Sequence, residues 1–141
     1  VIPRQLKSGK IVTEISRDAF KSSSIEEIHV PGTVKTIVDS AFANCTQLKK
    51  VVLSEGVEQL GSKVFEKCSK LESLVLPVTM KKLGNSSLPG IESNESLIIQ
   101  YNGTEEQLNT LLKTEPVWGN TGKAKFLLAD KKIVERTPFS Y

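Results

Sequence analysis

The chain has 141 residues, of which 38% are hydrophobic and 25% charged, and its 19 basic and 16 acidic residues give a net charge of +3. This is the composition of a folded, soluble protein of single-domain size rather than of a disordered chain. The two signs of charge are interspersed, and the apolar runs are far shorter than the roughly 18 residues of a membrane span, so neither nucleic-acid binding nor a transmembrane segment is expected.

The N-terminal segment introduces a pattern that returns later. Val1-Ile2-Pro3 has the form of a strand end closed by proline, and the turn signal Ser8-Gly9 follows within a polar connection. A first set of apolar residues then begins, which comprises Val12, Ile15, Phe20, Ile25, Ile28 and Val30. Because the chain has neither an initiating Met nor a signal peptide, we expect it to begin inside a larger precursor or to have been trimmed.

The next two segments, Val34–Leu53 and Val57–Leu76, repeat one another. Each of seven positions in the first has a residue of the same type 23 places later. The first members of these pairs are Val34, Ile37, Phe42, Cys45, Leu48, Val51 and Leu53. Self-similarity at a fixed period in the twenties is the signature of a leucine-rich-repeat solenoid.

Each copy has the same physical reading. Leu48, Val51 and Leu53 alternate as in a strand, whereas the spacing over Ile37–Cys45 is helical. Residues suited to helix N-caps precede this turn at matched positions: Asp39, Ser62 and Asn85. We therefore predict an α/β solenoid, a right-handed coil with a parallel sheet on its concave side and short helical turns on its convex side. A stacked column is expected from Phe20, Phe42 and Phe65, ended by Leu88.

The C-terminal part departs from the repeat. A fourth copy begins at Val78 and decays around Pro89-Gly90, with Ile99 still assigned to the 23-residue register. We predict a solenoid of about four repeats over residues 1–101 and a cap over 102–141. The cap should contain a helix at about 105–113, opened by a capping box of Thr104 and Gln107, and short strands at about 125–128 and 132–135.

These motifs resemble the BspA-like class of leucine-rich repeats. The core pattern of that class, I-G-x-x-A-F-x-x-C-x-x-L-x-x-V-x-L-P, corresponds to the repeats here, with Gly61 and Gly84 at its glycine and with departures at Ser16 and Val38. The resemblance covers residues 1 to about 107. It implies a secreted or cell-surface protein, mostly of host-associated bacteria, with repeats linked to adhesion and protein binding and with no catalytic residues.

Side chains that alternate outward from the strands are the candidate binding residues. A column of His29, Val52, Val75 and Ile98 should offer roughly 200–400 Å² of partly exposed surface, at the edge of what marks a binding patch. The set we predict to contact a partner comprises His29, Lys50, Val52, Ser73, Val75 and Ile98. Two alternatives stay open: β-branched residues suit any sheet, and the tail could fold back over the column.

Catalytic and metal-binding readings have weaker support. His29 is the only histidine and lies on a strand, with no motif placing a nucleophile or an orienting carboxylate beside it. Cys45 and Cys68 are expected to be buried thiols, because parallel Cα–Cβ bonds on adjacent coils would keep their Cβ atoms about 4.8 Å apart, too far for a disulfide. We expect no enzyme, cofactor or metal site.

The sequence thus favours a non-catalytic, extracellular or cell-surface recognition module. Its concave sheet would bind a protein of a host or bacterial surface, or a surface glycan. The alternative is a structural spacer or stalk that presents another domain of a larger surface protein.

Overall fold

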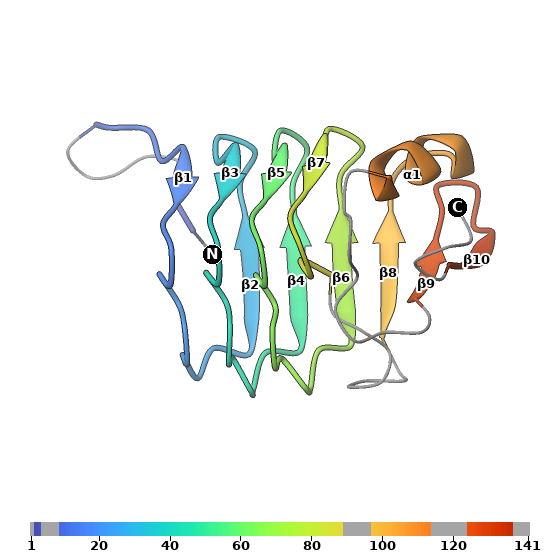
Figure 1. Cartoon of the computed structure of the whole chain (residues 1–141). Helices are drawn as coiled ribbons and strands as arrows, with labels where there is room; N and C mark the ends of the chain where they lie inside the picture. Colours follow the sequence, from blue (N-terminus) through green and yellow to red (C-terminus); the bar gives the residue numbers. More distant parts are fainter. Residues whose placement is uncertain (1, 4–8, 89–96, 114–123, 137–141) are drawn as a thin grey trace.

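The computed structural model describes residues 2–3, 9–88, 97–113 and 124–136. Their strands form two sheets that run along the molecule (Figure 1). The larger sheet has the order β10-β9-β8-β6-β4-β2 and the smaller has the order β1-β3-β5-β7. The elements are β1 Glu14–Ile15, β2 Glu27–Val30, β3 Thr36–Ile37, β4 Lys50–Leu53, β5 Gln59–Leu60, β6 Ser73–Leu76, β7 Lys82–Leu83, β8 Ile98–Tyr101, α1 Glu105–Leu112, β9 Ala124–Leu127 and β10 Ile133–Arg136.

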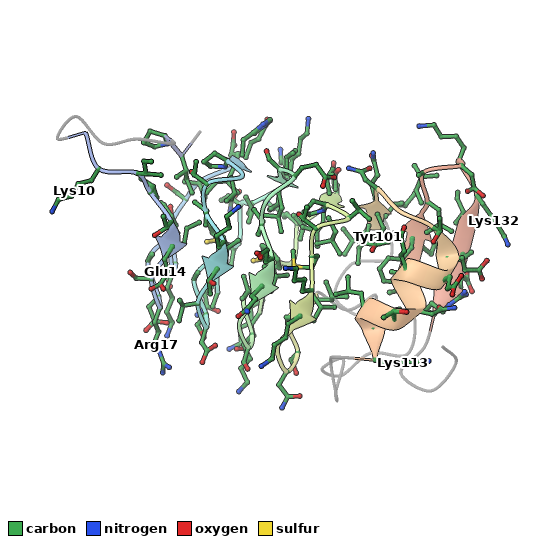
Figure 2. The ribbon with its side chains drawn as sticks, turned by 90° about the horizontal axis from the view of Figure 1, so that it is seen from above. Lys10, Glu14, Arg17, Tyr101, Lys113 and Lys132 are labelled. Atoms are coloured by element: carbon green, nitrogen blue, oxygen red, sulfur yellow. The ribbon has the colours of Figure 1, made fainter. Side chains whose placement is uncertain are left out.

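Each coil contributes one strand to each of the two sheets, and equivalent strands of successive coils pair in parallel. Val51 of β4 lies opposite Ile28 of β2 and Leu74 of β6, which is the predicted 23-residue step. Viewed from above, Glu14 and Arg17 lie at one end of this stack, and Lys132 lies at the other end beyond α1 (Figure 2). The predicted fold, a solenoid with stacked parallel strands, is confirmed.

The segments with helical spacing form turns instead of helices. Residues 39–44 are hydrogen-bonded turns in which Ser40 and Asn44 have φ angles of 58°. Left-handed residues at this spacing interrupt a right-handed helix. The expected N-cap role was also wrong, because the Oδ1 atom of Asp39 accepts a hydrogen bond from the Ser62 amide of the next coil at 2.9 Å. Asp39 therefore connects two coils rather than starting a helix.

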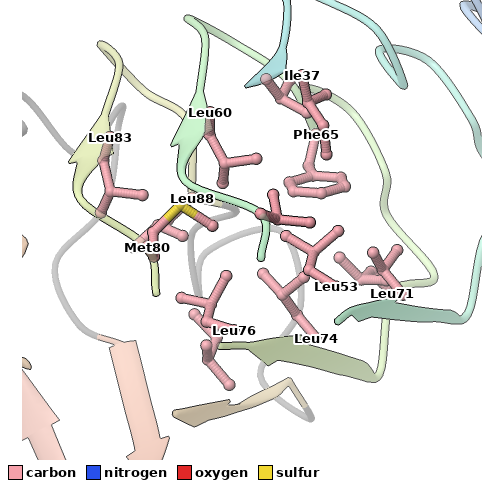
Figure 3. Close-up of a cluster of buried hydrophobic side chains, with 14 of the residues drawn as sticks. Ile37, Leu53, Leu60, Phe65, Leu71, Leu74, Leu76, Met80, Leu83 and Leu88 are labelled. Carbon is pink, nitrogen blue, oxygen red and sulfur yellow. The ribbon is translucent and has the colours of Figure 1, made fainter. Parts of the chain in front are cut away.

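The core lies between the two sheets and is continuous along the stack. Leu60 and Leu83 of the smaller sheet and Leu74 and Leu76 of the larger one point into the same interior (Figure 3). The predicted phenylalanine column is present. The Phe42 ring stacks on Phe20 at a centroid distance of 5.3 Å and on Phe65 at 5.7 Å, and Leu88 is buried as well.

The two cysteines are buried free thiols, as predicted. The Cys45 Sγ donates a hydrogen bond to the Phe20 carbonyl at 3.1 Å, and the Cys68 Sγ donates one to the Phe42 carbonyl at the same distance. Burial raises the pKa of Cys45, and it raises the pKa of Cys68 to about 12. The thiols thus connect coils through hydrogen bonds, and their high pKa disfavours the reactive thiolate.

The C-terminal elements extend the larger sheet as well as closing the core. Helix α1 begins at Glu105 behind the predicted capping box of Thr104 and Gln107, and its apolar side is buried. Strand β9 pairs in parallel with β8, and β10 pairs antiparallel with β9. Helix and strands agree with the predicted positions to within one residue. The predicted division into two domains stays a prediction.

An ion-pair cluster fastens α1 to the β9–β10 hairpin. Glu105 receives hydrogen bonds from Lys132 Nζ at 3.0 Å and from Arg136, whose side chain is only 13% exposed. Arg136 Nε also donates to Asn109 Oδ1 at 3.0 Å. The hydrogen bonds from Lys132 and Arg136 lower the pKa of Glu105 below its ordinary value.

Replacing Glu105 with glutamine is therefore expected to lower the melting temperature near neutral pH. Because the folded-state pKa is depressed, the charge of Glu105 stabilises the fold above the ordinary value of 4.5, and this contribution is lost as pH falls through the folded pKa. The difference between wild type and E105Q, measured by thermal denaturation, should shrink below pH 4.5. The control E106Q removes a charge from the same exposed helix turn, and an equal loss in both variants would contradict the prediction.

Candidate interaction surface

The outer face of the larger sheet carries two rows of outward side chains, one residue from each strand in each row. We call the row that begins at His29 the upper row and the row that begins at Glu27 the lower row. The upper row follows β-sheet pairing through His29, Val52, Val75, Gln100, Leu127 and Ile133. Four residues of the lower row are paired in the same way, namely Glu27, Lys50, Ser73 and Ile98.

The predicted column was wrong at its last member. Strand β8 is displaced by two residues from the 23-residue step, so Val75 lies opposite Gln100 and Ser73 lies opposite Ile98. The extra residues fall between Leu88 and Leu97, and the decay predicted around Pro89-Gly90 lies outside the described residues. A displacement of two keeps each side chain on its original face. Ile98 therefore still points outward, 39% exposed, but in the lower row.

The C-terminal hairpin contributes apolar residues that the sequence analysis missed. Leu127 lies opposite Gln100 on one side and Ile133 on the other, and Ile133 is 56% exposed. Since β9 and β10 lie beside β8, these strands continue the face instead of folding back over it. The alternation of β9 could have signalled this, but no repeat register connects the hairpin to the solenoid. Together with Val52, Val75 and Ile98, the two residues form an apolar patch that spans five strands.

A polar cluster occupies the N-terminal end of the same face. The Glu27 Oε1 atom lies 2.5 Å from His29 Nε2 and 3.9 Å from Lys50 Nζ. The hydrogen bond with His29 lowers the pKa of Glu27, and the positive charge of Lys50 adds to this shift. The sequence analysis had found no carboxylate beside His29. The structure places one there, because residues two apart on a strand share a face.

This cluster lacks the parts of a catalytic or metal site. Among the described residues, the side chain that hydrogen-bonds the His29 ring is the Glu27 carboxylate, and the Lys50 amine lies near Glu27. Nucleophilic catalysis by a histidine base requires instead a nucleophile within hydrogen-bonding distance of the ring. Across the described ranges, no three His, Cys, Asp or Glu residues are grouped so as to hold a metal ion. Among the same residues, no helix is long and apolar enough to cross a membrane.

A cavity of about 400 Å³ separates α1 from the neighbouring coil, with Val78, Met80, Tyr101 and Leu111 among its lining residues. Its polar lining is largely engaged within the protein: Gln107 completes the helix cap and Thr110 donates to the Glu106 carbonyl. Few groups converge to orient a ligand. The outer face of the larger sheet is therefore the better candidate site.

Stacked coils that each place one longer strand in a shared parallel sheet, with outward side chains aligned in rows across the strands, define a leucine-rich-repeat solenoid. The family model described as BspA type leucine rich repeat region matches residues 13–114 with six copies. The chain belongs to this family. Leucine-rich repeat proteins are generally non-catalytic modules that bind other proteins.

Two solved structures share the fold. A leucine-rich repeat protein from Bacteroides capillosus is 27% identical, with a TM-score of 0.62, and the match covers 72% of this chain and 75% of that one. The leucine-rich repeat protein of T. pallidum is 22% identical, with a TM-score of 0.56, over 70% of this chain and 56% of that one. The second likeness shows the fold alone. No curated protein matches the chain.

Proposed function

We propose that the chain is a non-catalytic module of an extracellular or cell-surface protein, and that it mediates adhesion by binding another protein through the outer face of its larger sheet. The observation that carries the proposal is the apolar patch across this face. Ile98 and Ile133, two of its members, are 39% and 56% exposed. Outward residues of a sheet that faces water are normally polar, so an apolar patch there is typical of a contact surface.

The composition of the face supports a protein partner. A stable protein interface covers about 800 Å² on each side and has an apolar centre with a polar rim. Val52, Val75 and Ile98 would form the centre, and the Glu27–His29–Lys50 cluster would form one part of the rim. Ser73 lies between Lys50 and Ile98 and adds a small hydroxyl to the contact. A bacterial or host surface protein has the chemistry for such a contact, and a surface glycan is the alternative ligand.

The test is the double substitution Val52→Glu and Val75→Glu, which places two carboxylates side by side in the apolar centre. Binding to an array of surface proteins and glycans should fall by at least tenfold, as expected from about 1.4 kcal/mol or more of lost interaction. The fold should persist because both side chains point outward and are only half-buried.

The matched control is the double substitution Thr36→Glu and Gln59→Glu, at paired outward positions of β3 and β5 on the smaller sheet. It adds the same charge to the other side of the solenoid and should leave binding unchanged. Retained binding in the folded V52E/V75E protein would contradict the proposal that the partner binds this face. If the wild-type chain binds nothing on the array, the result would instead favour the alternative function, a structural spacer that presents another domain.

A further inference from the structure

The cavity beside α1 has one polar lining group that the protein itself does not engage. Gln107 and Thr110 use their polar atoms within the helix and its cap, whereas the Tyr101 hydroxyl has no hydrogen-bond partner among the described residues. Tyr101 is only 2% exposed, and it ends β8 on the α1 side of the solenoid (Figure 2). The hydroxyl of a tyrosine buried to this extent normally has a partner, and a molecule that entered the cavity would supply one.

The Tyr101 ring is held in place by the backbone around it. A Cβ atom added at Gly103 would lie 2.6 Å from Tyr101 Cε2, so Gly103 lies directly against the edge of the ring. The chain is fixed on both sides here, because the Asn102 amide donates to the Leu76 carbonyl at 3.1 Å and the Ala129 amide donates to the Gly103 carbonyl at 3.2 Å. A ligand would therefore meet a hydroxyl that is already ordered, which lowers the entropic cost of binding.

The remaining walls of the cavity are mainly apolar. Met80 and Leu111 are almost fully buried, and Val78 is 37% exposed, so it brings an apolar side chain to the surface beside the cavity. Val78 follows Glu55 by 23 residues and Gly32 by twice that number, so this coil is more apolar here than the two before it. An apolar cavity of roughly 150 Å³ can hold benzene. The volume of about 400 Å³ is therefore sufficient for a substituted ring.

The charges around the cavity disfavour an ionised ligand. Burial raises the pKa of the Tyr101 hydroxyl, and the negative charge of Glu55 raises this pKa further, so the hydroxyl keeps its proton and can donate it to a hydrogen bond. Glu106 adds a second carboxylate to the lining, whereas the Lys81 amine lies 3.4 Å from the Glu58 carboxylate. An anion would be repelled by the carboxylates, and an ammonium group has no acceptor for the hydroxyl proton. An uncharged acceptor, such as a carbonyl oxygen, suits the cavity.

We propose that the cavity beside α1 binds a small, uncharged and mainly apolar molecule whose carbonyl oxygen accepts a hydrogen bond from the Tyr101 hydroxyl. The apolar part of this molecule would pack against Met80, Leu111 and Val78. None of the residues that line the cavity belongs to the upper or the lower row of the larger sheet. The two sites can therefore be tested separately.

The test uses acetophenone, an uncharged aromatic ketone, as the probe. Met80 is the only methionine of the chain, so selective ¹³C labelling of the methionine methyl group gives a single NMR signal at the cavity. Titration of the full chain with acetophenone should shift this signal saturably. Tyr101→Phe keeps the ring and should raise the dissociation constant about three- to tenfold, the usual effect of one neutral hydrogen bond.

The matched control is Thr110→Val, which removes another hydroxyl from the lining of the same cavity. Thr110 Oγ1 already donates to the Glu106 carbonyl at 3.0 Å, so T110V should leave the dissociation constant unchanged. A Met80 signal that does not move up to the solubility limit of acetophenone overturns the proposal. Equal dissociation constants for wild type and Y101F overturn it as well, and so does equal weakening in Y101F and T110V. The V52E/V75E protein should bind acetophenone as wild type does, whether or not the outer face binds a partner.

Discussion

Replacing Phe42 with alanine is expected to lower the free energy of unfolding by about 3–5 kcal/mol, the usual range for removal of a buried aromatic ring. The side chain is fully buried, and neighbouring rings stack on both of its faces, at interplanar angles of 9° and 5°. Its loss leaves a cavity that the rigid coils above and below cannot close. Chemical denaturation followed by circular dichroism measures this change.

Phe20 supplies the matched control for this substitution. Its ring occupies the same column but is only partly buried and stacks on Phe42 alone among the described rings. The loss for Phe20→Ala should be roughly half as large, because less area is removed from the core and the cavity opens to solvent. A loss for F20A that equals or exceeds the loss for F42A would contradict the idea that stacking from both sides holds the column.

The repeat period predicted the features that depend on side-chain order alone. A 23-residue step places equivalent residues one strand apart, so the pairing of β2, β4 and β6 and the aromatic column followed from it. The free state of Cys45 and Cys68 followed from the same stacking. These predictions succeeded because apolar burial repeats with the coil and requires no knowledge of individual dihedral angles.

The backbone of the turns could not be predicted in this way. Two successive turns bring Ala41 and Cys45 to the interior just as a helix would, so the apolar spacing is the same for both conformations. Only the sign of φ separates them, and Ser40 and Asn44 have positive values. A serine at such a position carries no strong sequence signal, because left-handed residues outside glycine are uncommon and are selected by their surroundings.

The outward residues at the centre of the outer face could be predicted from the sequence, whereas those at its C-terminal end could not. Val52 and Val75 followed from alternation within an intact repeat. The displaced register of β8 and the addition of β9 were hidden because the period ends there, and Leu127 has no equivalent in an earlier coil. Two factors therefore determine which residues lie on this face. The repeat places Val52 and Val75 there, and strand pairing outside the repeat places Gln100, Leu127 and Ile133 there.

Replacing Gly32 with alanine is expected to destabilise the solenoid by about 3 kcal/mol, at the upper end of the range for overpacking. An added Cβ would lie 1.9 Å from the Glu55 carbonyl oxygen of the next coil, and this contact is to backbone, which cannot rotate away. Coils stack at a fixed strand spacing, so relief requires the β2–β4 and following pairs to separate locally.

Gly9 provides a control that separates the steric clash expected at Gly32 from the cost of a positive φ angle. Its φ of 87° disfavours any side chain, but a Cβ there would meet nothing within 4 Å. Gly9→Ala should therefore cost only the roughly 1–2 kcal/mol of a left-handed residue. Denaturation measures both changes, and hydrogen exchange should localise the G32A effect to the amides around Gly56. A G32A loss no larger than that of G9A would mean that the coils can separate at this corner, and the close approach of Gly32 to Glu55 would then not hold the stack together.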